Sequence, residues 1–280
     1  MISLTVVIIT KDEEKNIGRC LKSITGLADR VVVVDSGSTD HTEQICRGYG
    51  RRYLRYGSRL DFYTHKFKGY SDQLNWAFGN TSIDTDWIMR LDADETVTSE
   101  LKAELIKRLP VEKAEVTGIV LRRRVYFMGR WIRHGGRYPD KLLRIFRTGR
   151  GRCEDRVMDE HLITDGRIRE YRYDIIDRNE KPLSFWVEKH NRYSDLEAEA
   201  YFTDRASGDI SGAGSQSQAK KMVKGWYYRL PPFFRALLYF KYRYFLRLGF
   251  LDGTEGLIYH FLQGFWYRFL VDAKIVERRK

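Results

Sequence analysis

Two continuous apolar runs near the N-terminus predict the first elements of the fold. Residues 4–9 (LTVVII) and 30–35 (RVVVVD) are rich in β-branched side chains, as is typical of strands buried on both faces of a parallel sheet. Between them, residues 17–24 place four apolar side chains at helical spacing, and this pattern ends near Gly26. The pattern therefore predicts a strand, a helix and a second parallel strand.

The same kind of pattern continues over the first third of the chain. A second helix is expected to begin within residues 38–46 (STDHTEQIC), capped by Ser38 or Thr39. Residues 86–92 (DWIMRLD) predict another strand, and residues 99–109 predict another helix. This alternation indicates an α/β fold.

The middle of the chain has a different pattern. Residues 115–132 alternate apolar and polar positions with Gly129 at a turn, and residues 140–152 predict a further strand and turn. We expect these strands to extend the parallel half in antiparallel fashion. The Gly- and Ser-rich residues 207–219 predict a flexible loop or linker.

Composition narrows the choice of partner. With 280 residues, 42% of them hydrophobic, the chain can bury a large core, so disorder is not expected. Fifty Lys and Arg against 38 Asp and Glu favour an anionic partner, either nucleic acid, a membrane surface or a phosphorylated small molecule. The cysteines Cys20, Cys46 and Cys153 are widely spaced and predict buried free thiols in a reducing compartment. The N-terminus is expected to be a strand and not a signal sequence.

Most of the net charge lies in an aromatic C-terminal segment. Residues 220–280 carry 13 Lys or Arg and 4 Asp or Glu. Five apolar residues share one face of a helical projection: Phe234, Leu237, Leu238, Phe245 and Leu248. Three arginines lie away from that face: Arg235, Arg243 and Arg247. The segment is either an interfacial helix on anionic lipid or a helix packed on the domain with its charged side in water. No apolar run approaches the ~20 residues of a membrane-spanning helix, so any membrane contact is expected to be peripheral.

Acidic side chains follow several predicted strands. Glu13 lies in the loop after the first, Asp35 ends the second, and Asp92 and Asp94 follow a later one in LDADE. Because ligands bind beyond the carboxyl ends of parallel strands, we expect these carboxylates to share one crevice. Such a cluster favours a hard divalent cation, Mg²⁺ or Mn²⁺, which also takes phosphate oxygens of a substrate. Asp35 is also suited to accept hydrogen bonds from a ribose hydroxyl or a uracil N–H.

The combination of these motifs resembles a known family. TVVIITKDEEKNIGRCLKSI, VVVVDSGSTDHT and WIMRLDADE are similar to the signatures of inverting family 2 glycosyltransferases, which have the GT-A fold and use nucleotide-diphosphate sugars. GGRYPDKLLRIFRTGRGRCEDRVMDEHL and YRYFLRLGFLDGTEG resemble a bacterial subgroup that builds surface polysaccharide and lipopolysaccharide. The resemblance implies a Rossmann-like, mixed, mostly parallel sheet flanked by helices, followed by a C-terminal helical extension.

The resemblance also implies an organisation and a location. Residues 1–110 would form the half of the GT-A domain that binds the nucleotide sugar. Residues 111–206 would form the acceptor-binding and catalytic half, and residues 207–280 the loop and the basic, aromatic helical segment. The enzyme is expected to be cytoplasmic, with possible peripheral contact with the inner face of an anionic membrane.

On the donor side, the resemblance implies four nucleotide contacts: Thr10, Glu13, Asp35 and Ser38. Asp92 is expected to face the ribose and the metal. Asp94 is expected to hold Mg²⁺ or Mn²⁺ on the diphosphate of the donor, for which a UDP-sugar is the first candidate. In such families a second-half carboxylate acts as general base on the acceptor hydroxyl. The matching stretch, VMDEHL, leaves the base open between Asp159 and Glu160, with Glu160 preferred.

Further candidates come from the second half of the chain. Arg144 is predicted to reach the diphosphate, since Arg is suited to bidentate phosphate contact, whereas Arg147 is expected to be an ordinary strand residue. Residues 122–124 (RRR) are expected to form a solvated strand face. Three residues are candidates for stacking on, or hydrogen bonding to, a glycan or lipid-linked acceptor: Trp131, Tyr138 and Asp140.

Other classes of protein fit the sequence less well. A sugar nucleotidyltransferase needs a Gly-rich basic loop after the first strand, and here that loop is TKDEEKN. A nucleic-acid-binding protein would explain the basic tail, but not carboxylates that repel phosphate. An inactive sugar-binding module would not need the Asp-X-Asp motif and a candidate base.

Overall fold

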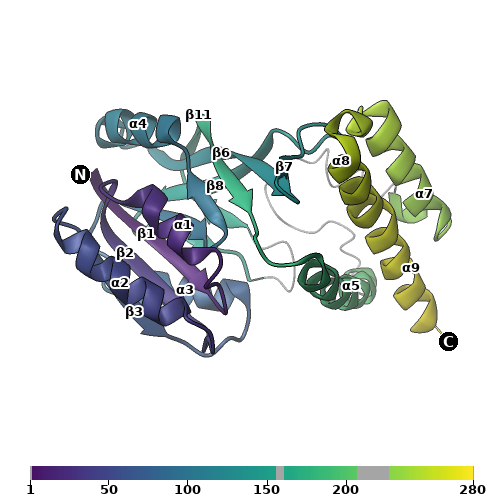
Figure 1. The fold of residues 1–280 in the computed structure, drawn as a ribbon, viewed down its shortest axis with the longest axis horizontal. Helices are drawn as coiled ribbons and strands as arrows, with labels where there is room; N and C mark the ends of the chain where they lie inside the picture. Colours follow the sequence, from purple (N-terminus) through teal and green to yellow (C-terminus); the bar gives the residue numbers. More distant parts are fainter. Residues whose placement is uncertain (1, 156–160, 207–226, 280) are drawn as a thin grey trace. The chain divides into compact units, whose positions relative to one another are not determined.

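The computed structural model describes residues 2–155, 161–206 and 227–279 (Figure 1). Contacts group the chain into two compact units. Three ranges form the first: residues 1–126, 139–156 and 160–180. The second is formed mainly by residues 127–138 and 181–280. The predicted division at residues 110 and 206 stays a prediction, and the linker predicted at residues 207–219 lies outside the described residues.

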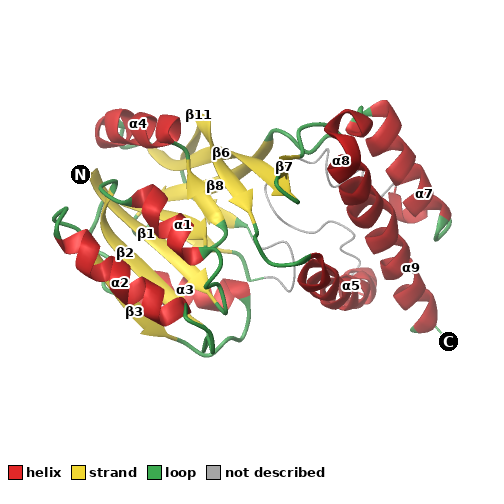
Figure 2. Ribbon diagram, in the orientation of Figure 1, coloured by secondary structure: helices red, strands yellow, loops and turns green. Residues whose placement is uncertain are grey.

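The first unit is built on a mixed sheet with the strand order β3-β2-β1-β4-β8-β6-β11-β5 (Figure 2). Strands β3, β2, β1 and β4 are parallel to one another, β8 is antiparallel to β4 and β6, and β11 is parallel to β6. The strands of this sheet are β1 (Ile2–Thr10), β2 (Ala28–Asp35), β3 (Arg59–Thr64), β4 (Trp87–Asp92), β5 (Glu95–Val97), β6 (Val116–Phe127), β8 (Asp140–Arg147) and β11 (Arg167–Arg178). The predicted mixed sheet with an antiparallel extension is confirmed.

Helices cover both faces of this sheet. The helices of the first unit are α1 (Ile17–Ile24), α2 (Thr42–Leu54), α3 (Tyr70–Asn80) and α4 (Ser99–Arg108), followed by a short 3-10 turn (Leu109–Val111). A separate antiparallel pair joins β9 (Gly151–Cys153) to β10 (Leu162–Thr164). Three cysteines are free and buried, as predicted: Cys20, Cys46 and Cys153.

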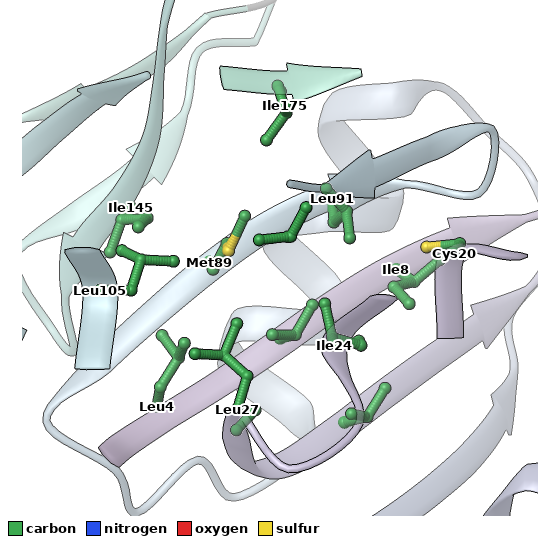
Figure 3. Packing of buried hydrophobic residues seen from close by; sticks show 14 of the residues in the cluster. Leu4, Ile8, Cys20, Ile24, Leu27, Met89, Leu91, Leu105, Ile145 and Ile175 are labelled. Carbon is green, nitrogen blue, oxygen red and sulfur yellow. The ribbon is translucent and has the colours of Figure 1, made fainter. Parts of the chain in front are cut away.

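The alternation of side chains along the central strand creates two apolar cores. On one face, Leu4 and Ile8 of β1 pack with residues of α1, α2 and α4, and Figure 3 shows Leu4 beside Leu27 and Ile8 beside Cys20. On the other face, Val7 packs in the layer that contains the buried residues of α3. Both faces of β1 are thus buried, which is why its sequence is a continuous apolar run.

The second helix begins within the predicted residues 38–46, but after a different cap residue. Helix α2 starts at Thr42 after the cap residue His41, so the predicted caps Ser38 and Thr39 are wrong. The Ser38 hydroxyl instead bonds to the carboxylate of Asp35 and accepts a hydrogen bond from the backbone N–H of Asp12, in the loop after β1. Its side chain is therefore unavailable to the first turn of the helix.

The second unit is helical. After the short strand β7 (Arg130–Trp131) it comprises α5 (Leu183–Ala206), α7 (Phe234–Lys241), a π-helical stretch (Tyr242–Leu246), a 3-10 turn (Gly249–Asp252), α8 (Gly253–His260), a second π-helical stretch (Phe261–Trp266) and α9 (Tyr267–Glu277). Gly129, with φ +82°, occupies the turn predicted for it before β7. Within the described part of the chain, every helix is too short or too polar to span a bilayer.

In α7 and the residues that follow it, the burial of two arginines differs from the prediction. Phe234 and Phe245 of the predicted apolar face are 53% and 54% exposed. Arg235 and Arg243, expected either on anionic lipid or in water, are buried to 3% and 6% exposure, and of the three arginines only Arg247 is exposed. Arg235 is neutralised by buried Asp272 through Nε at 2.8 Å, which explains why this charge can lie inside.

Candidate active site

The ends of the parallel strands bring the predicted donor-site residues together. In the register of the sheet, Thr10 of β1 is the partner of Asp35 on β2, and Ile9 is the partner of Asp92 on β4. Strand β1 lies between β2 and β4, so the strand order reverses here. Three predicted side chains therefore share the edge of the sheet at which α/β folds bind ligands.

The Asp35 carboxylate organises the loop that follows β2. Its Oδ2 accepts hydrogen bonds from the backbone N–H groups of Gly37 and Ser38 at 2.8 and 2.7 Å, and the Ser38 hydroxyl bonds to Oδ1. Gly37 has φ +85°, a conformation that glycine adopts without strain. The carboxylate is only 4% exposed and is fixed in one orientation before any ligand binds.

The loops that follow β1 and β2 hold each other by reciprocal hydrogen bonds. The backbone N–H of Glu13 donates to the Thr42 hydroxyl at 2.8 Å, and that of Glu14 donates to Asp40 Oδ2 at 3.0 Å. In return, Asp12 Oδ1 accepts from the backbone N–H of Thr39 at 2.8 Å. The loop TKDEEKN is thus held to the loop after β2 by two of its backbone N–H groups and by the Asp12 carboxylate.

Two buried oxygens at this edge lack a protein partner. Thr10 Oγ1 and Gln73 Oε1 are buried and accept no hydrogen bond from any residue that the structure describes. The Gln73 side chain is fixed by donating from Nε2 to Ser36 Oγ at 2.7 Å and to the carbonyl of His65 at 2.8 Å. Leaving such oxygens unpaired costs about 1–3 kcal/mol each. Gln73 was not among the predicted site residues, and it lies on α3, a helix that was not predicted either.

The LDADE motif contains a buried ion cluster. Arg144 of β8 is 3% exposed and donates to Asp92 Oδ2 at 3.1 Å and to the Glu95 carboxylate, which is 1% exposed. Glu95 Oε2 accepts the backbone N–H of Asp92 at 3.1 Å, and Arg90 Nε donates to Asp92 Oδ1 at 3.1 Å. Asp92 is therefore oriented from three directions.

The two carboxylates of this cluster differ in pKa. Burial opposes the ionisation of Asp92, but Arg144 and Arg90 outweigh it and hold the Asp92 pKa well below its usual range. Burial raises the pKa of Glu95 to about 7, against the attraction of Arg144 and with repulsion from Asp92. Asp92 is consequently an anion at neutral pH, which suits a metal ligand and an acceptor for ribose hydroxyls.

Asp94 is held by the end of β11. Its Oδ2 accepts a hydrogen bond from Asn179 Nδ2 at 2.9 Å, and its carbonyl accepts the backbone N–H of Arg178 at 3.0 Å. Asn16 links Asn179 to the Glu13 carboxylate, donating to the two side chains at 3.3 and 2.7 Å. No sequence pattern indicates Asn16 or Asn179, since their hydrogen bond joins residues more than 160 positions apart.

The donor set at this edge fits a hard divalent cation. Asp94 Oδ1 accepts no hydrogen bond from the described residues, so it is available to a ligand. Across the same residues, no group of three or more His, Cys, Asp or Glu side chains is arranged to hold a metal. Mg²⁺ commonly takes one or two carboxylates and completes its octahedron with phosphate oxygens and water. Asp92 and Asp94 together meet that requirement.

The predicted solvated face at residues 122–124 is wrong. Arg122, Arg123 and Arg124 are partly buried, and each pairs with carboxylates from other parts of the chain. Arg123 bonds to Asp140 at 2.7 Å and lies 3.6 Å from Glu95, so it extends the ion cluster of LDADE. These charges are half-buried because β8 and β11 supply their counterions.

The remaining candidates are distributed over both units. Arg147 donates to the carbonyl of Val116 at 3.0 Å and lies over the ring of Trp87, which agrees with an ordinary strand residue. Asp140 belongs to the first unit; Trp131 and Tyr138 belong to the second, where their rings meet edge to face at 5.0 Å. The roles of these residues, and the phosphate contact of Arg144, stay predictions. Asp159 and Glu160 lie outside the described residues.

A parallel half-sheet, an Asp35 turn and an Asp-X-Asp motif at the switch point define a class of protein, the GT-A glycosyltransferases. A mannosyltransferase from Pyrobaculum calidifontis, solved with GDP-Man and Mn²⁺, has this fold at a TM-score of 0.55 and 14% identity, covering 99% of this chain and 88% of that one. The sequence model of glycosyl transferase family 2 matches residues 5–177, and the chain belongs to that family.

Curated relatives are similar over different lengths. The lipopolysaccharide core biosynthesis glycosyltransferase LpsC of Rhizobium meliloti is 28% identical over 98% of this chain and 92% of its own length. An uncharacterized glycosyltransferase of Rickettsia bellii is 35% identical over 36% of this chain and 31% of its own length. The similarity to LpsC therefore extends through both compact units.

Proposed function

We propose that this family 2 glycosyltransferase is metal-dependent and inverting. Its donor is a nucleotide-diphosphate sugar, with a UDP-sugar as the first candidate. Its acceptor is a hydroxyl of a glycan or lipid-linked glycan in lipopolysaccharide or other surface polysaccharide synthesis, at the cytoplasmic side of a membrane. The similarity to LpsC over nearly the whole chain supports this pathway class.

The observation that carries the proposal is the set of fixed carboxylates at the sheet edge. Asp35 is locked beside Thr10, while Asp92 and Asp94 are oriented by Arg144 and Asn179. Side chains held in place by packing and hydrogen bonds need no reorganisation when a ligand binds. A nucleoside beside Asp35 would place its diphosphate towards the Asp-X-Asp motif.

The residues of the first unit have distinct tasks in this reaction. Thr10, Asp35 and Ser38 bind and orient the nucleoside. Asp92 and Asp94 hold Mg²⁺ or Mn²⁺, which when bound stabilises negative charge on the diphosphate. Arg144 keeps Asp92 ionised and aligned.

The transfer itself needs a base on the acceptor side. The general base, Glu160 or Asp159, takes the proton of the acceptor hydroxyl while that oxygen bonds to the anomeric carbon. The bond from this carbon to the phosphate oxygen breaks, and the nucleoside diphosphate leaves with the electron pair. Attack on the face opposite the leaving group inverts the anomeric centre without a covalent enzyme intermediate.

The metal-site assignment can be tested with Asp94→Ala and a matched control. Asp84→Ala removes an exposed carboxylate, 74% accessible, from the loop that precedes β4. We expect Asp94→Ala to abolish sugar transfer measured by release of the nucleoside diphosphate, and Asp84→Ala to retain it, with both variants folded by circular dichroism. Full activity of Asp94→Ala would refute the proposed metal site.

The general base is identified by a second pair of variants. Glu160→Gln should lower kcat by about 10²–10⁴-fold, the usual contribution of a positioned base, and leave donor affinity unchanged. Asp159→Asn should have little effect on kcat. If only Asp159→Asn lowers turnover, then Asp159 is the base.

A further inference from the structure

The helix α7 and the π-helical stretch after it expose the apolar residues and bury the arginines. Phe234, Phe245 and Leu246 are 53%, 54% and 76% exposed, whereas Arg235 and Arg243 are 3% and 6% exposed. Arg235 bonds to Asp272, and Arg243 Nε donates to the carbonyl of Gly135 at 2.9 Å. A helix on the surface of a protein surrounded by water has the opposite arrangement.

The helical run from α8 to α9 continues this exposed apolar surface. Leu257, Phe261 and Phe269 lie four or eight residues apart, on one side of that run, and are 42–45% exposed. Ring contacts tie them to α7: Phe240 meets Phe261 at 6.2 Å, and Phe233 meets Phe269 at 4.7 Å. We call six of the exposed residues of both runs the apolar C-terminal surface: Phe234, Phe245, Leu246, Leu257, Phe261 and Phe269.

Exposed apolar side chains are concentrated in this part of the chain. Of the twenty large apolar side chains that are exposed among the described residues, eleven lie between positions 234 and 269. Single exposed apolar residues are normal, but a contiguous group marks an interaction site.

The charges around this surface are of one sign. Lys241 and Arg247 are exposed, on the same helix and just after it. Three of the four acidic residues of the segment are engaged: Asp252 accepts from His134 at 2.7 Å, Asp272 is buried with Arg235, and Glu255 lies 3.8 Å from Arg130. The fourth, Glu277, is exposed at the end of α9, eight residues beyond the last residue of the surface. The surface thus combines Phe and Leu with free cations, the composition that binds anionic headgroups and the adjacent acyl chains.

We propose that the apolar C-terminal surface docks the enzyme onto an anionic lipid bilayer, with its Phe and Leu side chains in the interface and Lys241 and Arg247 on lipid phosphates. A second copy of the chain is a poorer fit. Two-fold pairing of this surface with itself would place two surfaces of the same positive sign against each other, and like charges repel. Docking is independent of the donor and metal proposed above.

Vesicle cosedimentation of the full-length protein tests this docking. The vesicles contain phosphatidylcholine with or without an equal part of phosphatidylglycerol, at about 0.1 M salt, where surface charges are felt over about 10 Å. We expect binding to the anionic vesicles. Phe245→Ser/Leu246→Ser should weaken it by about tenfold or more, and Lys241→Gln/Arg247→Gln by about 25-fold, since each cation contributes about fivefold.

A control pair outside the surface makes the result specific. Leu54→Ser/Val111→Ser removes two equally exposed apolar residues, 69% and 77% accessible, from the first unit and should bind like the wild type. Failure of the wild type to bind anionic vesicles overturns the proposal, as does equal binding of the Phe245→Ser/Leu246→Ser variant with an unchanged melting curve. A lipid-free dimer that this variant converts to monomer would assign the surface to self-association instead.

Discussion

The buried pair of Glu95 and Arg144 orients the Asp-X-Asp motif and influences the charge of Asp92. Glu95 follows the Asp-X-Asp motif directly, yet its carboxylate is 1% exposed and turned to Arg144 and to the backbone of Asp92. It therefore braces the motif from inside the protein. One guanidinium serves two carboxylates, and Asp92 keeps the negative charge because Arg90 also pairs with it and because its side chain is 27% exposed, against 1% for Glu95.

We predict that Arg144→Gln destabilises the protein by about 3–5 kcal/mol, because it removes the buried cation that Asp92 and Glu95 share. Urea unfolding followed by circular dichroism measures this loss. Arg150→Gln is the matched control: its pair with Asp165 at 2.9 Å is 50–61% exposed, and such a pair contributes at most about 1 kcal/mol. Equal losses in both variants would show that Arg144 is not the counterion of the cluster.

Local motifs predicted some site residues and tertiary pairing decided others. Asp35, Asp92 and Asp94 could be found because each directly ends or follows a recognisable strand. Glu95 could not be assigned from the sequence, since its partner Arg144 lies 49 residues away. The arginines at 122–124 misled for the same reason, because their carboxylates come from positions at least 17 residues further along.

The hydrophobic pattern predicted the strands and helices that have a continuous or periodic apolar side. Strands β1, β2 and β4 were predictable because both of their faces are buried. Strand β11 was missed because its sequence, RIREYRYDIIDR, is charged, and its buried Asp174 is neutralised by Arg124 of β6. Helix α3 was missed because it buries polar Ser71 and Gln73, which weakens the apolar periodicity.

Helix α8 contains a histidine that should make stability depend on pH. His260 is fully buried, and burial, with Arg243 nearby and only partial compensation by Asp252, lowers its pKa to about 4. The unfolded chain protonates this residue near its ordinary pKa of about 6.5. As pH falls from 6.5 to 4, the unfolded state therefore binds a proton that the folded state does not bind. The free energy of unfolding falls by about 3 kcal/mol over this range.

Unfolding free energies measured by urea titration between pH 7.5 and 4 test this expectation. His260→Gln should lose less stability over that range than the wild type, by up to about 3 kcal/mol. Burial also lowers the pKa of His190 to about 4. Both proteins should therefore keep part of the loss of stability at low pH. The same pH dependence in wild type and variant would contradict the assignment.

On the scale of the whole molecule, ligand binding and surface docking are assigned to different units. The described donor-site residues, from Thr10 to Asn179, belong to the first unit, and the apolar C-terminal surface belongs to the second. A nucleotide sugar should therefore raise the unfolding temperature of the first unit.

We predict that a UDP-sugar at about 100 times its Kd raises this transition by about 5–10 °C, since binding at that excess contributes about 2.7 kcal/mol. The rise should require Mn²⁺ or Mg²⁺, because Asp92 and Asp94 bind the diphosphate through the cation and would otherwise repel it. A thermal-shift screen of nucleotide sugars with and without metal measures this, and a chelator should reverse the rise. Asp94→Ala should show no metal-dependent rise, whereas Asp84→Ala should match the wild type. An equal rise for Asp94→Ala in the presence of chelator would show that the donor binds without the metal, and the roles given to both aspartates would be wrong.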